Sequence, residues 1–165
     1  MRNLVPLISL AAGAIAAVTI AASGPVTAGG ANYAPVTDAA VLKECAACHM
    51  AFPAGLLPAR SWAAIMAGLK DHFGENAELD AEMARRIGDY LAANAAGSRD
   101  LRSKVQRGPQ QATAPLRITE LPWWRQKHDK KGRVATATLK RRGAKLQSDC
   151  VACHADAARG LFDDD

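Results

Sequence analysis

The segments "CAACH" at residues 45–49 and "CVACH" at residues 150–154 decide the fold of this 165-residue chain. In each, two cysteines three positions apart are followed directly by a histidine. C-x-x-C-H is the attachment motif of c-type haem. Two thiols on one helical turn can each add to a haem vinyl group, and the next residue places an imidazole under the iron. All four cysteines belong to these motifs. The sequence therefore predicts two covalently bound haem c groups.

Other uses of a C-x-x-C pair fit the chain less well. A redox disulfide is common for such a pair, but here both copies precede a histidine and no βαβ pattern accompanies them. A zinc ribbon needs pairs about 15–20 residues apart, whereas 101 residues separate Cys48 from Cys150. Structural disulfides leave the histidines without a role. We therefore assign the haem thioethers to Cys45, Cys48, Cys150 and Cys153, and proximal iron ligation to His49 (haem 1) and His154 (haem 2).

Each iron has a sixth coordination position, and two of the four histidines remain to fill these positions. His72 lies 23 residues after His49, and His128 lies 26 residues before His154. Aromatic residues that suit a haem edge stand beside both, namely Phe73 after His72, and Trp123 and Trp124 ahead of His128. The sequence predicts His72 as the distal ligand of haem 1 and His128 as that of haem 2. A crossed pairing and ordinary surface histidines are the alternatives.

Methionine is the rival sixth ligand, and the candidates are poorly placed. Met50 directly follows the proximal His49, so it starts on the wrong side of the haem ring. Met66 shares an apolar helix face with Trp62, so it is expected in the core, and Met83 likewise. Two bis-histidine irons leave no open position for oxygen or a substrate. Because His/Met ligation raises the haem potential, the prediction is two low-spin, low-potential centres for electron transfer.

The first 28 residues are expected to be a signal peptide. A positive start is followed by an apolar run over 4–22 and by small residues at 26–28 that suit a cleavage site. A transmembrane anchor is the alternative, because the run is nearly long enough to span a bilayer. Export to the periplasm suits the motifs, since haem c is attached outside the cytoplasm. No membrane span is expected after removal of the leader.

Charge is concentrated in the middle of the chain. Residues 99–145 hold 14 Lys and Arg against three acidic residues, whereas 29–98 and 146–165 are net negative. An exported protein meets little nucleic acid, so this segment is expected to neutralise haem propionates or to dock an acidic partner. Large aliphatic and aromatic residues are few, so the small chain needs a cofactor to complete its core.

The expected fold is mainly α, with little or no β structure. Two small haem lobes at 29–98 and 115–165 are joined by a linker at 99–114, and the first resembles a small class I cytochrome c. Thr37, Ser61 and Asp80 are expected to cap three helices, the third ending at Gly97. The expected elements after the linker are a short strand at 116–119, a short helix starting at Pro122, and a final helix over 146–158 with the second motif.

Three longer stretches resemble the bacterial dihaem cytochrome c family. They are "ECAACHMAFPAGLLPARSWAAIMAGLKDHFGENAELD" (44–80), "PLRITELPWWRQKH" (115–128) and "CVACHADAARGLFDDD" (150–165). The resemblance covers nearly the whole chain after the leader. It implies a periplasmic electron carrier with two bis-histidine haems. The implied partners are a high-spin, oxygen-binding monohaem cytochrome c as acceptor and a membrane b-type cytochrome as donor.

Two other functions compete with a free electron carrier, which is expected to be monomeric and not an enzyme. One is a small dihaem redox subunit of a larger periplasmic reductase complex. The other is a dihaem peroxidase, which keeps one iron open or able to open. The peroxidase is the weaker alternative, because dihaem peroxidase chains are usually about twice as long. The four histidines here also account for both axial positions of both irons.

Overall fold

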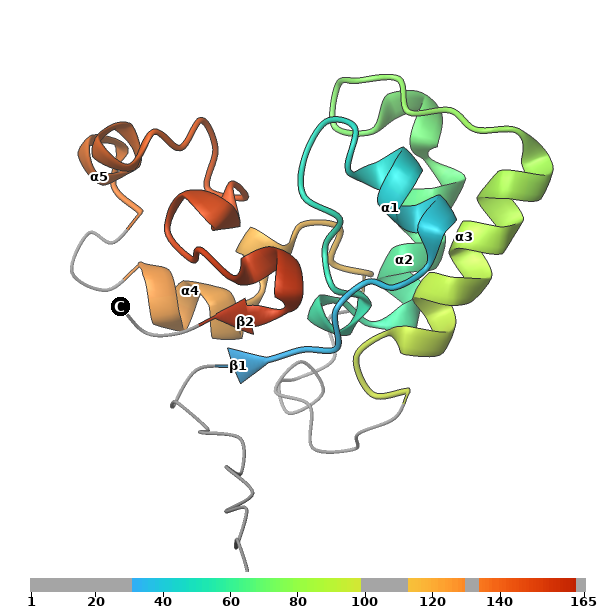
Figure 1. The fold of residues 1–165 in the computed structure, drawn as a ribbon, viewed down its shortest axis with the longest axis horizontal. Coiled ribbons are helices and arrows are strands. Elements are labelled where there is room, and N and C mark those ends of the chain that lie inside the picture. The colour runs from blue at the N-terminus through green and yellow to red at the C-terminus, as the bar shows by residue number, and fades with distance from the viewer. Residues whose placement is uncertain (1–30, 99–112, 130–133, 163–165) are drawn as a thin grey trace, which may run out of the picture.

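The computed structural model describes residues 31–98, 113–129 and 134–162 (Figure 1). The expected signal peptide, and all of the expected linker except residues 113 and 114, lie outside these residues. The described part is mainly helical, as predicted, and its only strands are two of two residues each. Within it, no helix has the length and apolar character needed to cross a membrane. The division into lobes at 29–98 and 115–165 remains a prediction.

The helices before residue 98 form one packed group (Figure 1). They are α1 (Ala39–Cys45), η1 (Ala54–Leu56), α2 (Ala59–Ala67), η2 (Leu69–Asp71) and α3 (Ala81–Asn94), where η marks a 3-10 helix. The centre of their core is Val41 of α1, Leu57 after η1 and Ile87 of α3, all almost completely buried. Met66 and Met83 pack against this core, which confirms that prediction.

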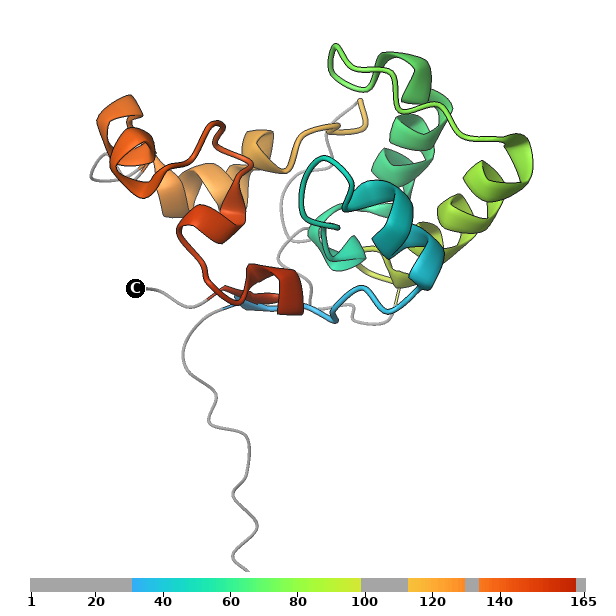
Figure 2. The same ribbon diagram turned by 45° about the horizontal axis from the view of Figure 1, so that its top comes forward.

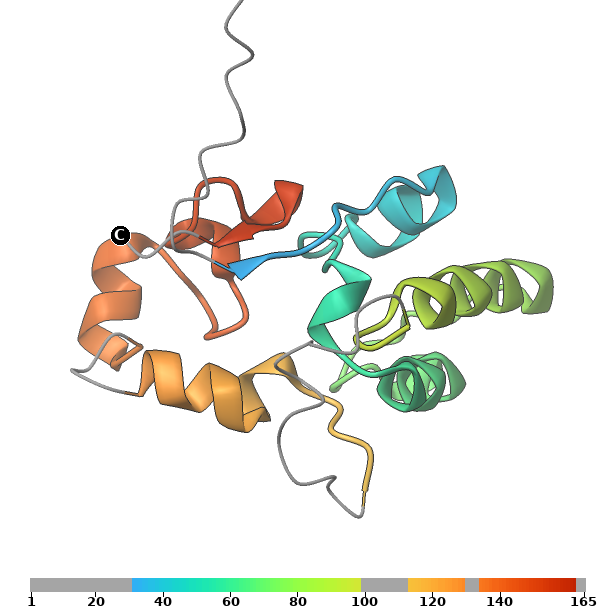
Figure 3. The same ribbon diagram turned by 90° about the horizontal axis from the view of Figure 1, so that it is seen from below.

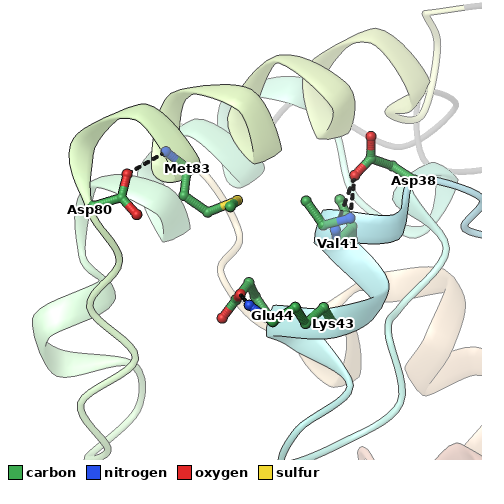
Figure 4. A network of polar contacts seen from close by, with 7 residues as sticks. Asp38, Val41, Lys43, Glu44, Asp80 and Met83 are labelled. Carbon is green, nitrogen blue, oxygen red and sulfur yellow. Dashed lines mark hydrogen bonds and ion pairs between the residues drawn. The ribbon is translucent and has the colours of Figure 1, made fainter.

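Aspartates cap α1 and α3 (Figure 4). Asp80 accepts a hydrogen bond from the Met83 N–H at 2.9 Å, as predicted. At α1 the prediction of Thr37 is wrong, because the next residue, Asp38, accepts from the N–H groups of Ala40 and Val41. A carboxylate at this position satisfies two donors that the helix leaves unpaired. These hydrogen bonds, the one from Val41 above all, lower the pKa of Asp38, and so does the nearby Arg86 guanidinium.

Two other predicted helix ends are displaced. The N-cap of α2 is Pro58 and not Ser61, because the Pro58 carbonyl already accepts from the Ser61 N–H at 2.9 Å. Ser61 is completely buried in the first turn, so its hydroxyl points into the protein instead of capping. Helix α3 ends at Asn94, short of Gly97, because Ala96 turns away to donate its N–H to the Leu57 carbonyl at 2.9 Å.

The residues after 113 form a second group with shorter elements (Figure 3). They are η3 (Ile118–Glu120), α4 (Pro122–His128), α5 (Thr136–Arg142), η5 (Cys150–Ala152) and η6 (Ala157–Arg159). Pro122 begins α4, as predicted. The predicted strand at 116–119 is wrong, since the Leu121 N–H closes a 3-10 turn onto the Ile118 carbonyl at 3.2 Å.

The predicted helix over 146–158 is also wrong. The second motif begins in η5 and runs into a break at 153–156, after which η6 follows. Bonds such as the one from the Cys153 N–H to the Cys150 carbonyl, at 3.1 Å, reach only three residues back. Short 3-10 turns of this kind place side chains without forming a continuous helix.

The two ends of the described chain meet in a small antiparallel ladder. β1 (Ala31–Asn32) pairs with β2 (Leu161–Phe162), and the Tyr33 N–H donates to the Gly160 carbonyl at 2.8 Å (Figure 2). The chain then passes from β1 to α1 in the other group, as Figure 1 shows. The N-terminal segment thus ties the C-terminal group to the helices before residue 98.

Replacing Gly160 with alanine should destabilise the protein by about 2–5 kcal/mol, since a left-handed residue costs about 1–2 kcal/mol and an overpacked contact about 1–3 kcal/mol. Gly160 has φ +80°, and an added Cβ would collide with the Tyr33 carbonyl oxygen. Gly143→Ala is the control, because Gly143 has φ +71° but open space around it. Its cost should be only that of the left-handed conformation, about 1–2 kcal/mol. Denaturant unfolding of the haem-loaded proteins measures both, and equal losses would contradict the ladder's role.

Candidate haem sites

The structure brings the first motif histidine together with His72. His49 follows the end of α1, and His72 follows η2, where its backbone N–H donates to the Glu75 carbonyl at 2.7 Å. The ring centroids of His49 and His72 are 6.1 Å apart and their planes meet at 28°. Histidines 23 residues apart in the sequence thus face one another in space.

His128 and His154 form an equivalent pair in the C-terminal group. His128 is the last residue of α4, and His154 follows η5, with its N–H donating to the Cys150 carbonyl at 2.8 Å. Their ring centroids are 6.2 Å apart and their planes meet at 82°. Each pair therefore joins one motif histidine to one histidine from outside the motifs, in the uncrossed pairing that the spacing favours.

Both separations suit an iron held between two imidazoles. A metal–imidazole bond is about 2.0–2.1 Å long, and the ring centroid lies about 1.1 Å beyond the bonded nitrogen. Two imidazoles on opposite sides of one metal therefore have centroids about 6.3 Å apart. The observed 6.1 and 6.2 Å agree with this value. Imidazoles in direct contact would lie closer, so the pairs have the spacing that a bis-histidine haem requires.

Hydrogen bonds orient one imidazole of each pair. Nδ1 of His49 lies 2.7 Å from the Met50 carbonyl oxygen, and Nδ1 of His128 lies 2.9 Å from the Trp124 carbonyl oxygen. A carbonyl can only accept, so Nδ1 carries the proton and the lone pair is on Nε2. This is the usual arrangement of a metal-binding histidine. Burial, then His49 and Arg117, lower the pKa of His72, which favours the neutral form that binds metals.

Aromatic rings and one cation surround the first pair. Phe52 stacks on His49 with ring centroids 4.8 Å apart. Phe73 lies 4.9 Å from the His72 ring and has the unusual φ of +60°. The Arg117 guanidinium covers the outer face of Phe73 at 4.1 Å, a cation–π contact. The sequence predicted Phe73 at this site but not Phe52, and not Arg117, which comes from the group after residue 113.

The second pair lies in a larger aromatic cluster. Trp124 stacks on His128 at 4.2 Å and an angle of 9°, and Phe162 of β2 presents its edge to His154 at 5.6 Å. Tyr33 contacts Phe162 at 5.7 Å and Trp123 at 6.5 Å. The prediction that aromatics gather here holds for Trp124. Tyr33 and Phe162 were missed, because only the β1–β2 pairing brings them to the site.

Trp123, in the aromatic cluster beside the second pair, holds a buried hydrogen-bond donor without an acceptor in the described part of the chain. Its indole Nε1 is buried and has no hydrogen-bond partner among the described residues. A buried donor of this kind is costly unless something accepts from it. Haem carries two propionates, and a carboxylate would satisfy this N–H. The donor set, the spacing of the histidines and this orphaned N–H all fit a haem.

None of the four cysteines is paired in a disulfide. Burial raises the pKa of Cys150 to about 11 and also raises that of Cys45. Redox-active C-x-x-C pairs instead lower the pKa of their first cysteine, because the thiolate is the reactive form. Both first cysteines here are shifted in the opposite direction, which disfavours a redox disulfide. Among the described residues, no three or more His, Cys, Asp or Glu side chains gather as a metal site.

Comparisons with known proteins agree with this geometry. The family model for dihaem cytochrome c matches residues 41–162. A dihaem cytochrome c structure from Rhodobacter sphaeroides is 49% identical, with a TM-score of 0.69, covering 78% of this chain and 99% of its own. One from Shewanella baltica is 38% identical, with a TM-score of 0.59, covering 76% and 86%. The search of curated proteins found no match.

These matches extend well beyond the two five-residue motifs. The family match begins within α1 and ends in β2, so it includes all four histidines of the two pairs. Membership implies two covalently bound c-type haems and a role in electron transfer. The chain belongs to the dihaem cytochrome c family.

Proposed function

We propose that this protein is a periplasmic electron carrier with two low-spin, bis-histidine haems. Haem supplies a one-electron couple at its iron when bound. The motif cysteines hold it through thioethers: Cys45 and Cys48 for haem 1, Cys150 and Cys153 for haem 2. His49 and His72 ligate the first iron, and His154 and His128 the second. The observation that carries this proposal is the 6.1 and 6.2 Å spacing of the two histidine pairs.

Two features of the sites favour electron transfer, namely the full set of iron ligands and the contacts that fix the imidazoles. With a histidine on each side, neither iron offers a position to oxygen, peroxide or a substrate. Stacking on Phe52 and Trp124 and the bonds to two backbone carbonyls hold the imidazoles in place. Because these ligands are fixed, the site would rearrange little when the iron gains or loses an electron. This arrangement favours a non-enzymatic carrier over a peroxidase.

The proposed acceptor is a high-spin monohaem cytochrome c with an acidic surface, and the proposed donor is a membrane b-type cytochrome. Exposed Lys140, Arg141 and Arg142 of α5 supply the docking charge at the end of the molecule away from α3 (Figure 1). The carrier is proposed to act as a free, exported monomer. Purification only as part of a stable complex would favour the subunit alternative.

Neutralising the three basic residues of α5 with glutamine should slow electron transfer to an acidic acceptor about tenfold at low ionic strength. The effect should fade as salt screens the charges. Arg60, Lys70 and Arg85 are equally exposed on the other group, and their triple glutamine variant is the control. Stopped-flow mixing of the reduced carrier with the oxidised acceptor gives the rates. Equal slowing by both variants would rule out docking at α5, and rapid peroxide turnover would contradict a carrier.

A further inference from the structure

The two histidine pairs differ in the angle between their ring planes. The planes of His49 and His72 meet at 28°, whereas those of His128 and His154 meet at 82°. The centroid separations are almost equal, at 6.1 and 6.2 Å. The pairs therefore differ in ring rotation and not in spacing. The first pair is nearly parallel and the second nearly perpendicular.

Contacts within the chain fix the rotation of the second pair. The Trp124 indole lies 9° from parallel to the His128 ring, and the Trp124 carbonyl accepts from Nδ1 at 2.9 Å. Both contacts come from Trp124, one turn earlier in α4, and both constrain the His128 ring. On the other side, Phe162 of β2 meets His154 at 66°. Neither ring can turn by a large angle without losing one of these contacts.

The first pair is held by different contacts. The His49 ring lies 26° from parallel to Phe52, and its Nδ1 is 2.7 Å from the Met50 carbonyl oxygen. His72 exchanges backbone hydrogen bonds with Glu75, which closes a tight loop and limits where the ring can point. Iron binding alone would let an axial imidazole rotate easily. The protein therefore determines the ring angle at each site.

The ring angle changes the electronic structure of a low-spin ferric iron. Each axial imidazole interacts with the iron dπ orbital perpendicular to its own plane. Parallel rings raise one dπ orbital above the other and give a rhombic EPR spectrum. Perpendicular rings raise both orbitals alike and give a highly anisotropic signal with a much larger maximum g value. Orientation of the axial ligands is thus a means by which a protein tunes a haem.

The same difference affects the reduction potentials. Ferric iron has a hole in the dπ set and is stabilised when these orbitals split, whereas ferrous iron fills the set and gains nothing. Perpendicular rings therefore favour the ferrous form. Positive charge acts in the same direction: the described residues after 112 hold eight Lys and Arg against four acidic residues, whereas those at 31–98 hold five against eight. Arg117 belongs to the later group but lies over Phe73, beside the first pair.

We propose that the two irons are inequivalent, with a rhombic low-spin signal from the His49–His72 site and a large-g signal from the His128–His154 site. We assign the higher potential to the second site. The first electron from an external one-electron reductant then converts that ferric iron to ferrous while the first iron remains ferric. An electron entering at the first site moves to the second, which lies in the basic, acceptor-docking group. This inference rests on the bis-histidine ligation proposed above.

An EPR-monitored reductive titration of the haem-loaded protein tests this inference. The oxidised protein should show both low-spin signals, and the large-g signal should disappear first as dithionite is added. Two rhombic signals, or earlier loss of the rhombic one, would overturn the inference while leaving bis-histidine ligation intact. A high-spin signal in the oxidised protein would instead overturn the ligation itself. The two failures are therefore distinguishable.

Two variants assign the signals to the sites. Trp124→Leu removes the ring stacked on His128 and should shift only the large-g signal. Phe52→Leu removes the ring stacked on His49 and should shift only the rhombic signal. Each serves as the control for the other. The opposite assignment, or a shift of both signals in each variant, would contradict the inference. The wild-type titration remains a test of the order of reduction if the buried Trp124 proves essential for folding.

Discussion

His128→Ala should convert one of the two haems from low-spin to high-spin while the other stays unchanged. The imidazole of His128 lies opposite that of His154, with the 6.2 Å centroid spacing that an intervening iron requires. Without it, the second iron has an open sixth position. Visible and EPR spectra should show about half of the haem as high-spin, and carbon monoxide should bind to that half on reduction. Wild-type protein should bind carbon monoxide at neither site.

Two further variants sharpen this test. His72→Ala should open the first iron in the same way, and the double variant should open both. Met66→Leu with Met83→Leu is the control, since these volume-conserving changes remove two of the three candidate sulfur ligands with little effect on packing. Its spectrum should remain entirely low-spin. A wholly low-spin His128→Ala protein would show that another residue ligates the second iron.

Replacing both Cys150 and Cys153 with serine should reduce the covalently bound haem from two groups to one. Each thioether requires a cysteine sulfur, and no other cysteine remains near His154. The protein should lose the mass of one haem, and its pyridine haemochrome absorbance per chain should fall by half. The loss should also destabilise the C-terminal group, because the buried Trp123 N–H would lose its proposed acceptor.

The matched double variant at Cys45 and Cys48 should lose the first haem and keep the second. Single cysteine variants should retain haem through one thioether, with a shifted visible band from the unreacted vinyl group. Two covalent haems in either double variant would contradict the assignment of the cysteines. Loss of both haems from one double variant would show that the sites do not form independently.

The histidine pairs were predictable because covalent chemistry and simple counting constrain them. Each motif supplies one histidine, and only two other histidines exist. Helix starts with a specific local signal were also predictable, as at Asp80 and Pro122. At α1, two adjacent residues are both good caps, and only the structure shows that Asp38 is the one that accepts from the helix. Local chemistry does not decide between neighbours of similar propensity.

Long-range contacts were not predictable from the sequence. A two-residue strand has no periodicity, so nothing indicated that β1 and β2 would pair and bring Phe162 to His154. Arg117 appeared as one of many cations, and its place over Phe73 depends on how the two groups pack. The 3-10 turns at the second motif likewise follow from tertiary constraints on a short segment, which override its helical propensity.

Near-infrared magnetic circular dichroism of the oxidised protein tests the central claim most directly. Low-spin ferric haem has a charge-transfer band in this region whose position depends on the two axial ligands. Because the structure pairs His49 with His72 and His128 with His154 at the spacing of a shared iron, the bis-imidazole band should account for both haems. A band at the His/Met position, or a high-spin band from either iron, would contradict two bis-histidine haems.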